Sequence, residues 1–104
     1  MKLSEQTLEV LQNFSSINQS LLFKEGNVLK TVSPQKTVLA EVMVGDTFER
    51  QFGIYDLGQF LSAVSLMEEP ELELNDNSAN INDGNGTSID YRYADPSMIV
   101  TPPE

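Results

Sequence analysis

Cysteine and histidine are both absent from the 104 residues of this sequence. Their absence excludes disulfides, zinc sites built from Cys and His, thiol nucleophiles and an imidazole base. The serine hydroxyls consequently have no histidine that could activate them for nucleophilic attack. The segment Gly84-Asn85-Gly86 is not followed by the Lys-Ser/Thr pair of a phosphate-binding loop. We therefore predict that the chain is not an enzyme, with no catalytic residue and no cofactor.

Positive charge is scarce. The sequence has 6 Lys and Arg residues against 16 Asp and Glu residues, which gives a net charge of −10. Binding to nucleic acid depends largely on neutralising phosphates, so this balance opposes a general affinity for DNA or RNA. The basic residues are also scattered, and only folding could gather them into a patch. They are Lys2, Lys24, Lys30, Lys36, Arg50 and Arg92.

Long apolar runs are missing as well. No stretch approaches the ~20 residues that span a bilayer, and residues 1–5 lack the apolar core of a signal peptide. We expect a chain that has no membrane partner and works in the cytoplasm. Its length suits one domain rather than two, and residues 1–100 are predicted to form that domain.

An Asn- and Asp-rich stretch at residues 76–86 raises the alternative of a calcium-dependent binding module. An EF-hand loop needs glycine at its sixth position and glutamate at its twelfth. Counted from Asp76, those positions hold Ile81 and Thr87. We therefore predict polar turns of a hairpin here, and no metal ligands.

The first predicted element is an amphipathic helix of about three turns that begins after Ser4, a favourable N-cap residue. Apolar residues recur at helical spacing on one side and would pack against a sheet. The apolar side holds Leu3, Thr7, Val10, Leu11, Phe14 and Ile17, and the polar side holds Glu5, Glu9, Gln12 and Ser16, with Lys2, Gln6 and Asn13 at its margin.

Alternation with a period of two replaces the helical period from residue 20 onward. Residues 21–24 and 28–32 are predicted to pair as a hairpin around the turn Glu25-Gly26-Asn27.

The next two predicted strands cover residues 37–44 and 47–54, with a turn at Gly45-Asp46 between them. Arg50 falls on the same side of the second strand as its phenylalanines. We expect its stem to pack and its head to reach solvent or pair with an acid.

A second helix is predicted over residues 57–66, with Asp56 as its N-cap because the carboxylate can accept from first-turn amides. Gln59 can complete a capping box with the Asp56 amide, and Tyr55 and Phe60 are placed for a hydrophobic staple. Leucine, phenylalanine and valine recur on the inner side at helical spacing. The outer positions carry no charge and are Gly58, Gln59, Ser62 and Ser65.

Pro70 ends this helix, and three further strands are predicted at residues 71–74, around 79–81 and at 87–93. Residues 101–104 are predicted to start an interdomain linker, with the second domain not present in this chain. The order of elements predicts an α+β fold in which two helices pack across antiparallel β-sheets.

The segment Ile54-Tyr55-Asp56-Leu57 is followed by Phe60-Leu61 and Ser65-Leu66. Five further segments occur in a matching order: Met1-Lys2-Leu3-Ser4, Leu11-Gln12-Asn13-Phe14, Ile17-Asn18, Lys24-Glu25-Gly26 and Ala94-Asp95-Pro96-Ser97. Together they resemble the sliding clamp of tailed bacteriophages, the processivity factor of the DNA polymerase. The resemblance runs through essentially the whole chain.

This resemblance implies one domain of the DNA clamp fold, the first of two in each subunit, with helices lining the hole of a ring and sheets outside. It implies a homo-oligomeric ring, a trimer when the subunit is full length, that encircles duplex DNA and tethers the DNA polymerase without catalysis. A clamp loader would open and close the ring, and the late-transcription machinery is a further implied partner. The implied place is the cytoplasm of the infected bacterial host.

The resemblance places DNA-facing residues on the outer sides of the two helices, where Glu5 and Glu9 would oppose phosphates. The candidates are Lys2, Gln6, Gln12, Asn13, Gln59 and Ser62. The alternative is an acidic DNA mimic or a protein-interaction domain of a phage. A mimic should carry carboxylates at regular spacing on one surface, whereas here they cluster in turns and at residues 68–73.

Overall fold

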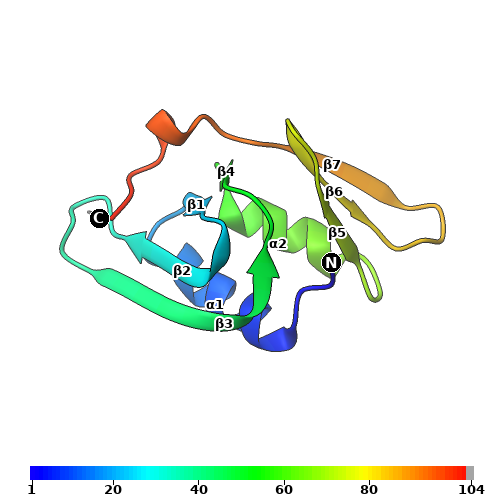
Figure 1. Cartoon of the computed structure of the whole chain (residues 1–104), viewed down its shortest axis with the longest axis horizontal. Helices are drawn as coiled ribbons and strands as arrows, with labels where there is room; N and C mark the ends of the chain where they lie inside the picture. The colour runs from blue at the N-terminus through cyan, green and yellow to red at the C-terminus, as the bar shows by residue number, and fades with distance from the viewer. Residues whose placement is uncertain (103–104) are drawn as a thin grey trace.

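The computed structural model describes residues 1–102 and contains two α-helices and three small antiparallel sheets (Figure 1). This architecture confirms the predicted α+β fold. The sheets have the strand orders β1-β4, β2-β3 and β5-β6-β7. The elements are α1 (Glu5–Ser15), β1 (Leu21–Phe23), β2 (Gly26–Val32), β3 (Leu39–Phe48), β4 (Phe52–Ile54), α2 (Leu57–Ser65), β5 (Glu71–Leu74), β6 (Ser78–Asn82), β7 (Ser88–Arg92) and the 3₁₀ helix η1 (Pro96–Met98).

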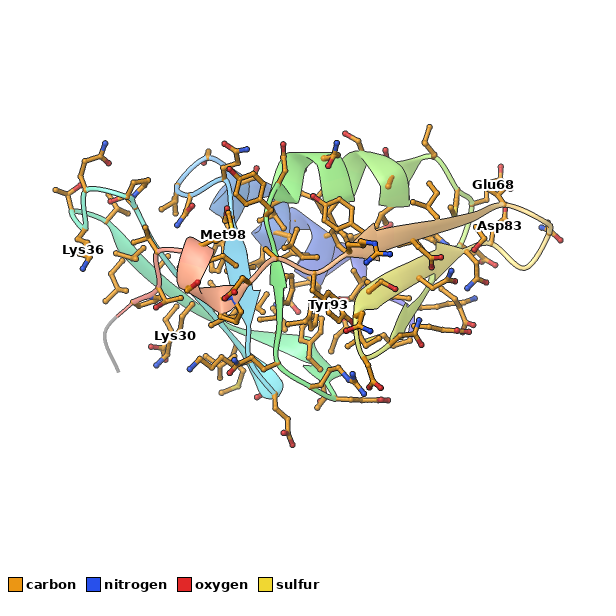
Figure 2. All side chains as sticks on the ribbon, turned by 90° about the horizontal axis from the view of Figure 1, so that it is seen from above. Lys30, Lys36, Glu68, Asp83, Tyr93 and Met98 are labelled. Carbon is orange, nitrogen blue, oxygen red and sulfur yellow. The ribbon has the colours of Figure 1, made fainter. Side chains whose placement is uncertain are left out.

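The helices form one layer and the strands form the other. Figures 1 and 2 show α1 and α2 next to each other on the same side of the sheets. The sheet β1-β4 lies in the middle of the molecule, with β2-β3 at one end and β5-β6-β7 at the other (Figure 1). The outer sides of both helices are therefore left free to meet another molecule.

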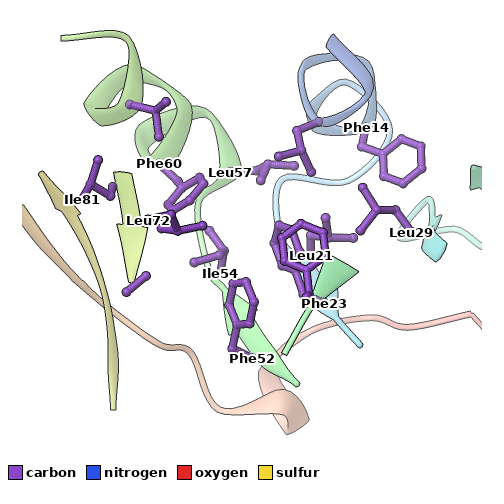
Figure 3. Packing of buried hydrophobic residues seen from close by; sticks show 14 of the residues in the cluster. Phe14, Leu21, Phe23, Leu29, Phe52, Ile54, Leu57, Phe60, Leu72 and Ile81 are labelled. Atoms are coloured by element: carbon purple, nitrogen blue, oxygen red, sulfur yellow. The ribbon is translucent and has the colours of Figure 1, made fainter. Parts of the chain in front are cut away.

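One hydrophobic core runs under both helices and joins the three sheets (Figure 3). Its aromatic centre comes from β1, β3 and β4. The ring of Phe23 stacks on Phe52 with centroids 4.4 Å apart and meets Phe48 edge-on at 5.1 Å. Each such fully buried side chain contributes about 1.5–3 kcal/mol. The helices add Leu11, Phe14, Leu57, Phe60 and Val64, and the third sheet adds Leu72, Ala79 and Ile81.

The predicted hairpin of residues 21–24 with 28–32 is wrong. Strand β1 pairs with β4 (Leu21 opposite Ile54), and β2 pairs with β3 (Leu29 opposite Val42). Gly26, at φ +116, directs the chain out of one sheet and into the other. Two strands that are adjacent in sequence thus belong to different sheets.

The predicted turn at Gly45-Asp46 is also wrong, because β3 runs straight through it to Phe48. Val44, Asp46 and Phe48 alternate onto the inner side of the strand, where Val44 and Phe48 are buried. The Asp46 carboxylate has hydrogen-bond donors there, at the start of α1. Oδ2 accepts from the Ser4 amide at 2.9 Å and from the Thr7 hydroxyl at 2.6 Å. A polar residue can therefore occupy an inward position within the strand.

Ser4 is the N-cap of α1 as predicted, and its hydroxyl oxygen accepts from the Thr7 amide at 3.2 Å. Asp56 is the N-cap of α2 as predicted, and its Oδ1 accepts from the Gln59 amide at 3.0 Å. The predicted capping box is wrong, because the Asp56 amide donates to the Tyr91 hydroxyl at 3.3 Å.

The predicted hydrophobic staple is not seen either. Tyr55 is 52% exposed, and the ring set edge-on to Phe60 is that of Tyr91, with centroids 5.8 Å apart. A residue from β7 thus takes over both local capping roles at the start of α2.

The three predicted strands after Pro70 are confirmed as β5, β6 and β7. The Asn- and Asp-rich stretch supplies the turns between them, as predicted. In the second of these turns, the Asp83 carboxylate accepts from the amides of Asn85 and Thr87 at 2.8 and 3.2 Å. Arg50 pairs with Asp76 at 2.9 Å, as expected for its head group.

The last segment of the described chain returns across the first two sheets. The Ala94 amide donates to the Gly53 carbonyl at 2.8 Å, and the side chain of Ile99 is buried. A Cβ on Gly53 would lie 2.7 Å from Ile99 Cδ1 and 3.0 Å from the Ala94 carbonyl oxygen, so a larger residue would have to displace the segment that packs over it. Of the predicted linker at residues 101–104, Thr101 and Pro102 have no regular structure, and residues 103–104 lie outside the described residues.

Candidate nucleic-acid interface

The outer faces of α1 and α2 carry the residues predicted to face DNA. All six are exposed, and they lie just before α1, on α1 and on α2: Lys2, Gln6, Gln12, Asn13, Gln59 and Ser62. Five of the six lie on the helices, which share one side of the sheets (Figure 2), and Lys2 precedes α1. On that side they do not gather into one patch.

Residues on α1 divide between the two margins of its outer face. Gln6 lies on the side of β3, since its Oε1 is 4.0 Å from where a Cβ on Gly45 would be. Asn13, seven residues later, shares that side of the helix. Gln12 lies on the opposite margin, where it lines a groove between α1 and α2. Glu5 and Glu9 lie at the centre of the predicted polar face and separate the residues on its two margins.

The charge of this surface is negative. Neither α1 nor α2 contains a lysine or arginine, while Glu5 and Glu9 are exposed on α1. Lys2 is the one basic candidate, and its Nζ lies 3.8 Å from Glu69 Oε2, with both side chains more than half exposed. Such an exposed pair is worth less than about 1 kcal/mol. Lys2 can therefore turn toward a phosphate at little cost, but it is alone.

An open groove of about 520 Å³ lies on the surface between the two packed helices. Leu8 and Leu61 are partly buried in it, and Val64 is buried. The exposed side chains of Glu5 and Glu9 line it from α1. An apolar floor with an acidic edge is unlike the basic grooves that hold nucleic-acid backbones.

Hydrogen bonds hold the two helix starts in place, and two of the residues that make them have shifted pKa values. Burial alone would raise the pKa of Asp46, but donation from Thr7 and Ser4 outweighs it and lowers that pKa. Burial raises the pKa of the Tyr91 hydroxyl, whose oxygen donates to the Asp56 carbonyl at 3.1 Å. Both residues position helices rather than meet a ligand.

Sequence reasoning missed Asp46 and Tyr91 as supports of the helix face. The signal for Asp46 was its place in the alternation that makes Val44 and Phe48 inward residues. The corresponding signal for Tyr91 was its alternation with Ile89 in β7, although nothing local pointed to Asp56 as its partner.

Other functions are weakly supported by the described residues. No group of three or more His, Cys, Asp or Glu side chains within residues 1–102 is arranged to hold a metal ion. The same part of the chain contains no helix with the length and apolar character needed to cross a membrane.

Comparison with known proteins places this chain in a family. Residues 2–101 match the family described as DNA polymerase processivity factor. The chain is 33% identical over 104 residues to the sliding clamp of Vibrio phage KVP40, covering 100% of this chain and 47% of that protein. It is 36% identical to the sliding clamps of Escherichia phage RB69 and Enterobacteria phage T4, covering 98% of this chain and 45% of each. The chain thus spans about half the length of these relatives, and the comparisons do not favour an acidic DNA mimic.

Proposed function

Because the chain belongs to the DNA polymerase processivity factor family, we propose that it is the N-terminal domain of a sliding-clamp subunit, which encircles duplex DNA and tethers the replicative polymerase. The observation that carries this proposal is the family match over residues 2–101, which includes both helices and all three sheets. The proposed role is that of a non-catalytic accessory protein.

The charge of the helix face agrees with a topological tether. A ring stays on DNA because it is closed, so it needs few contacts with the phosphates. Each lysine or arginine that neutralised a phosphate would add affinity and salt dependence. With Lys2 as the one basic candidate, the face would let the duplex pass without strong contacts.

The proposed DNA-facing residues are those at the outer sides of the helices: Lys2, Gln6, Gln12, Asn13, Gln59 and Ser62. Their amide and hydroxyl groups can donate hydrogen bonds to phosphate oxygens directly or through water. Glu5 and Glu9 would hold the backbone away from the centre of α1. Contact would then fall mainly at the margins of α1 and on α2.

The ring would be a homo-oligomer, a trimer of full-length subunits, that forms in the cytoplasm of an infected bacterial host. Its partners would include a clamp loader and the late-transcription machinery. Strand β3 supports assembly through its edge, because within residues 1–102 it pairs with β2 alone. Three large apolar residues on or beside it are also exposed: Val38 (49%), Leu39 (62%) and Met43 (69%). A free edge with exposed apolar side chains is a surface on which another strand can pair.

A fusion protein tests the proposal. This chain is joined to the second half of the RB69 clamp, and retention on DNA is measured after loading onto a nicked circle. We expect retention on the circle and loss when a restriction enzyme linearises it. The unaltered RB69 clamp is the positive control, and a reaction without loader is the negative control. A fusion that forms rings by light scattering but never stays on circles would contradict the proposal.

A further inference from the structure

The groove between α1 and α2 has two properties that do not favour binding of a DNA duplex. Its floor is apolar, with Leu8, Leu61 and Val64, and its α1 edge carries the exposed Glu5 and Glu9. A polyanion gains little from the apolar floor and is repelled by the carboxylates. The groove therefore suits a partner of the opposite charge.

Cations of the protein itself do not occupy this edge. None of the side chains that line the groove in the described chain is a lysine or arginine. Lys2, near the start of α1, lies within 3.8 Å of Glu69 instead. Glu5 and Glu9 are one helical turn apart and face the same side, so two positive charges at matching spacing could meet them together.

We propose that this groove binds a cationic amphipathic segment of a partner protein. Its leucine-type side chains would lie on Leu8, Leu61 and Val64, and its lysine or arginine residues would meet Glu5 and Glu9. The α1 residues that line the groove run from Glu5 to Gln12 and extend about 11 Å, so the groove has room for about two turns of a partner helix. Apolar contact provides affinity here, and the glutamates select the charge of the partner.

This inference goes beyond the proposed function and does not rest on it. The groove opens on the same side as the proposed DNA-facing residues, so a bound segment and a duplex would exclude each other in a closed ring. In the proposed ring, the segment would therefore act on a clamp that is free of DNA, and this consequence, unlike the binding itself, rests on the proposed function. If the fusion described above fails on circular DNA, the groove of this chain still binds the peptide. If peptide binding fails, retention on circles is unaffected.

Fluorescence anisotropy of a labelled synthetic peptide measures the binding with the chain as it stands. The probe is a helix-forming peptide with leucine at positions i, i+3, i+4 and i+7 and lysine beside them. A scrambled peptide of the same composition shows what charge alone does. We expect the scrambled peptide to bind at least about tenfold more weakly, because it cannot present both faces together. Equal binding of the two peptides would overturn the proposal.

Paired variants locate the charge contribution. Glu5→Gln with Glu9→Gln should weaken binding of the amphipathic peptide about fivefold, the effect of two exposed charge contacts. The matched control is Glu25→Gln with Glu49→Gln, which makes the same change of net charge. Both of these glutamates are exposed, they flank the paired residues Gly26 and Phe48, and neither of them lines the groove. Equal weakening by the two double variants would show attraction to the net charge only and would overturn the proposal.

A blocking variant locates the apolar contribution without altering the core. Ser65 is exposed and lines the groove, whereas Ser62, three residues earlier, is exposed on α2 outside it. Ser65→Tyr should reduce peptide affinity about tenfold by filling the groove. Ser62→Tyr should leave that affinity within about twofold. Thermal melting of both variants checks that they are folded. A folded Ser65→Tyr protein that binds as tightly as the unaltered chain would overturn the proposal.

Discussion

Asp46→Ala tests whether β3 holds the start of α1 and, with it, the helix face. The Asp46 carboxylate oxygen Oδ2 accepts from the Ser4 amide at 2.9 Å and from the Thr7 hydroxyl at 2.6 Å. A hydrogen bond to a charged group is worth about 1.5–3 kcal/mol. Both bonds share one oxygen of a partly exposed residue, and Thr7 keeps Ser4 Oγ at 3.1 Å as a partner. We expect the variant to lose about 2 kcal/mol of unfolding free energy and about 10 °C in Tm.

Urea unfolding followed by circular dichroism at pH 7 measures this loss. The control is Glu41→Gln, which removes an exposed pair with Lys30 at 3.7 Å and should cost less than about 0.5 kcal/mol. Unchanged m-values for both variants would show that the unfolded states are comparable. An Asp46→Ala loss as small as that of the control would refute the idea that Asp46 anchors α1.

The pH dependence gives a second readout of the same contact. The pKa of Asp46 is lower in the folded protein than the usual carboxyl value of about 3.9. Its stabilising effect is therefore fully present above that value and is lost as pH falls through the folded pKa. The difference in unfolding free energy between Asp46→Asn and the unaltered chain should shrink below about pH 4. A difference that stays constant to lower pH would mean that the charge of Asp46 is not involved.

Three further substitutions have defined outcomes. Tyr91→Phe removes the hydroxyl that accepts from the Asp56 amide and donates to the Asp56 carbonyl. Urea unfolding should show a loss of about 1 kcal/mol of unfolding free energy, and no loss would mean that water replaces the hydroxyl. Gly53→Ala places a Cβ 2.7 Å from Ile99 Cδ1 and 3.0 Å from the Ala94 carbonyl oxygen. A thermal melt should therefore report a loss of about 1–3 kcal/mol of unfolding free energy. An unchanged Tm would show that the segment containing Ala94 and Ile99 shifts to make room. Ser62→Glu should leave Tm unchanged but reduce loading of the clamp fusion onto circular DNA, and equal loading would place that face away from DNA.

Local structure was largely predictable from the sequence, because it depends on neighbouring residues. Ser4 and Asp56 are caps that act within a single turn, and both were predicted. The period of two in residues 71–93 was sufficient to predict the last three strands. Each cap bonds an amide three positions along the chain, and the alternation that marks a strand is contained within that strand.

Strand pairing and helix anchoring were harder to predict, because they join residues far apart in the chain. Leu21 pairs with Ile54 rather than with a neighbour in β2, and Gly26 gave a local hairpin signal that the fold does not use. Asp46 looked like a turn residue beside Gly45, although its partner is a helix start about forty positions earlier in the chain. Alternation identifies which side a residue faces, but not which element lies there.

The exposure of the candidate DNA-facing residues was predictable from the sequence, but the shape and charge of the surface between the helices were not. Periodicity placed Gln12 and Gln59 on outer faces, and both are exposed. The division of the face by Glu5 and Glu9, and the groove beside them, required the packing of α1 against α2. The exposure of a side chain can be predicted from the periodicity of its own helix, whereas a groove depends on how two helices pack together.

A sliding clamp has to remain on DNA and yet move along it, and these demands favour different surfaces. Strong phosphate contacts would lengthen residence at each position, because every neutralised phosphate adds to the affinity. A closed ring has no need of that affinity. The helix face of this chain offers one weakly paired lysine, several amides and hydroxyls, and two glutamates at the centre of α1. That combination agrees with the proposal that DNA passes this surface, and the groove proposed to bind a positively charged protein segment would be accessible when no DNA is present.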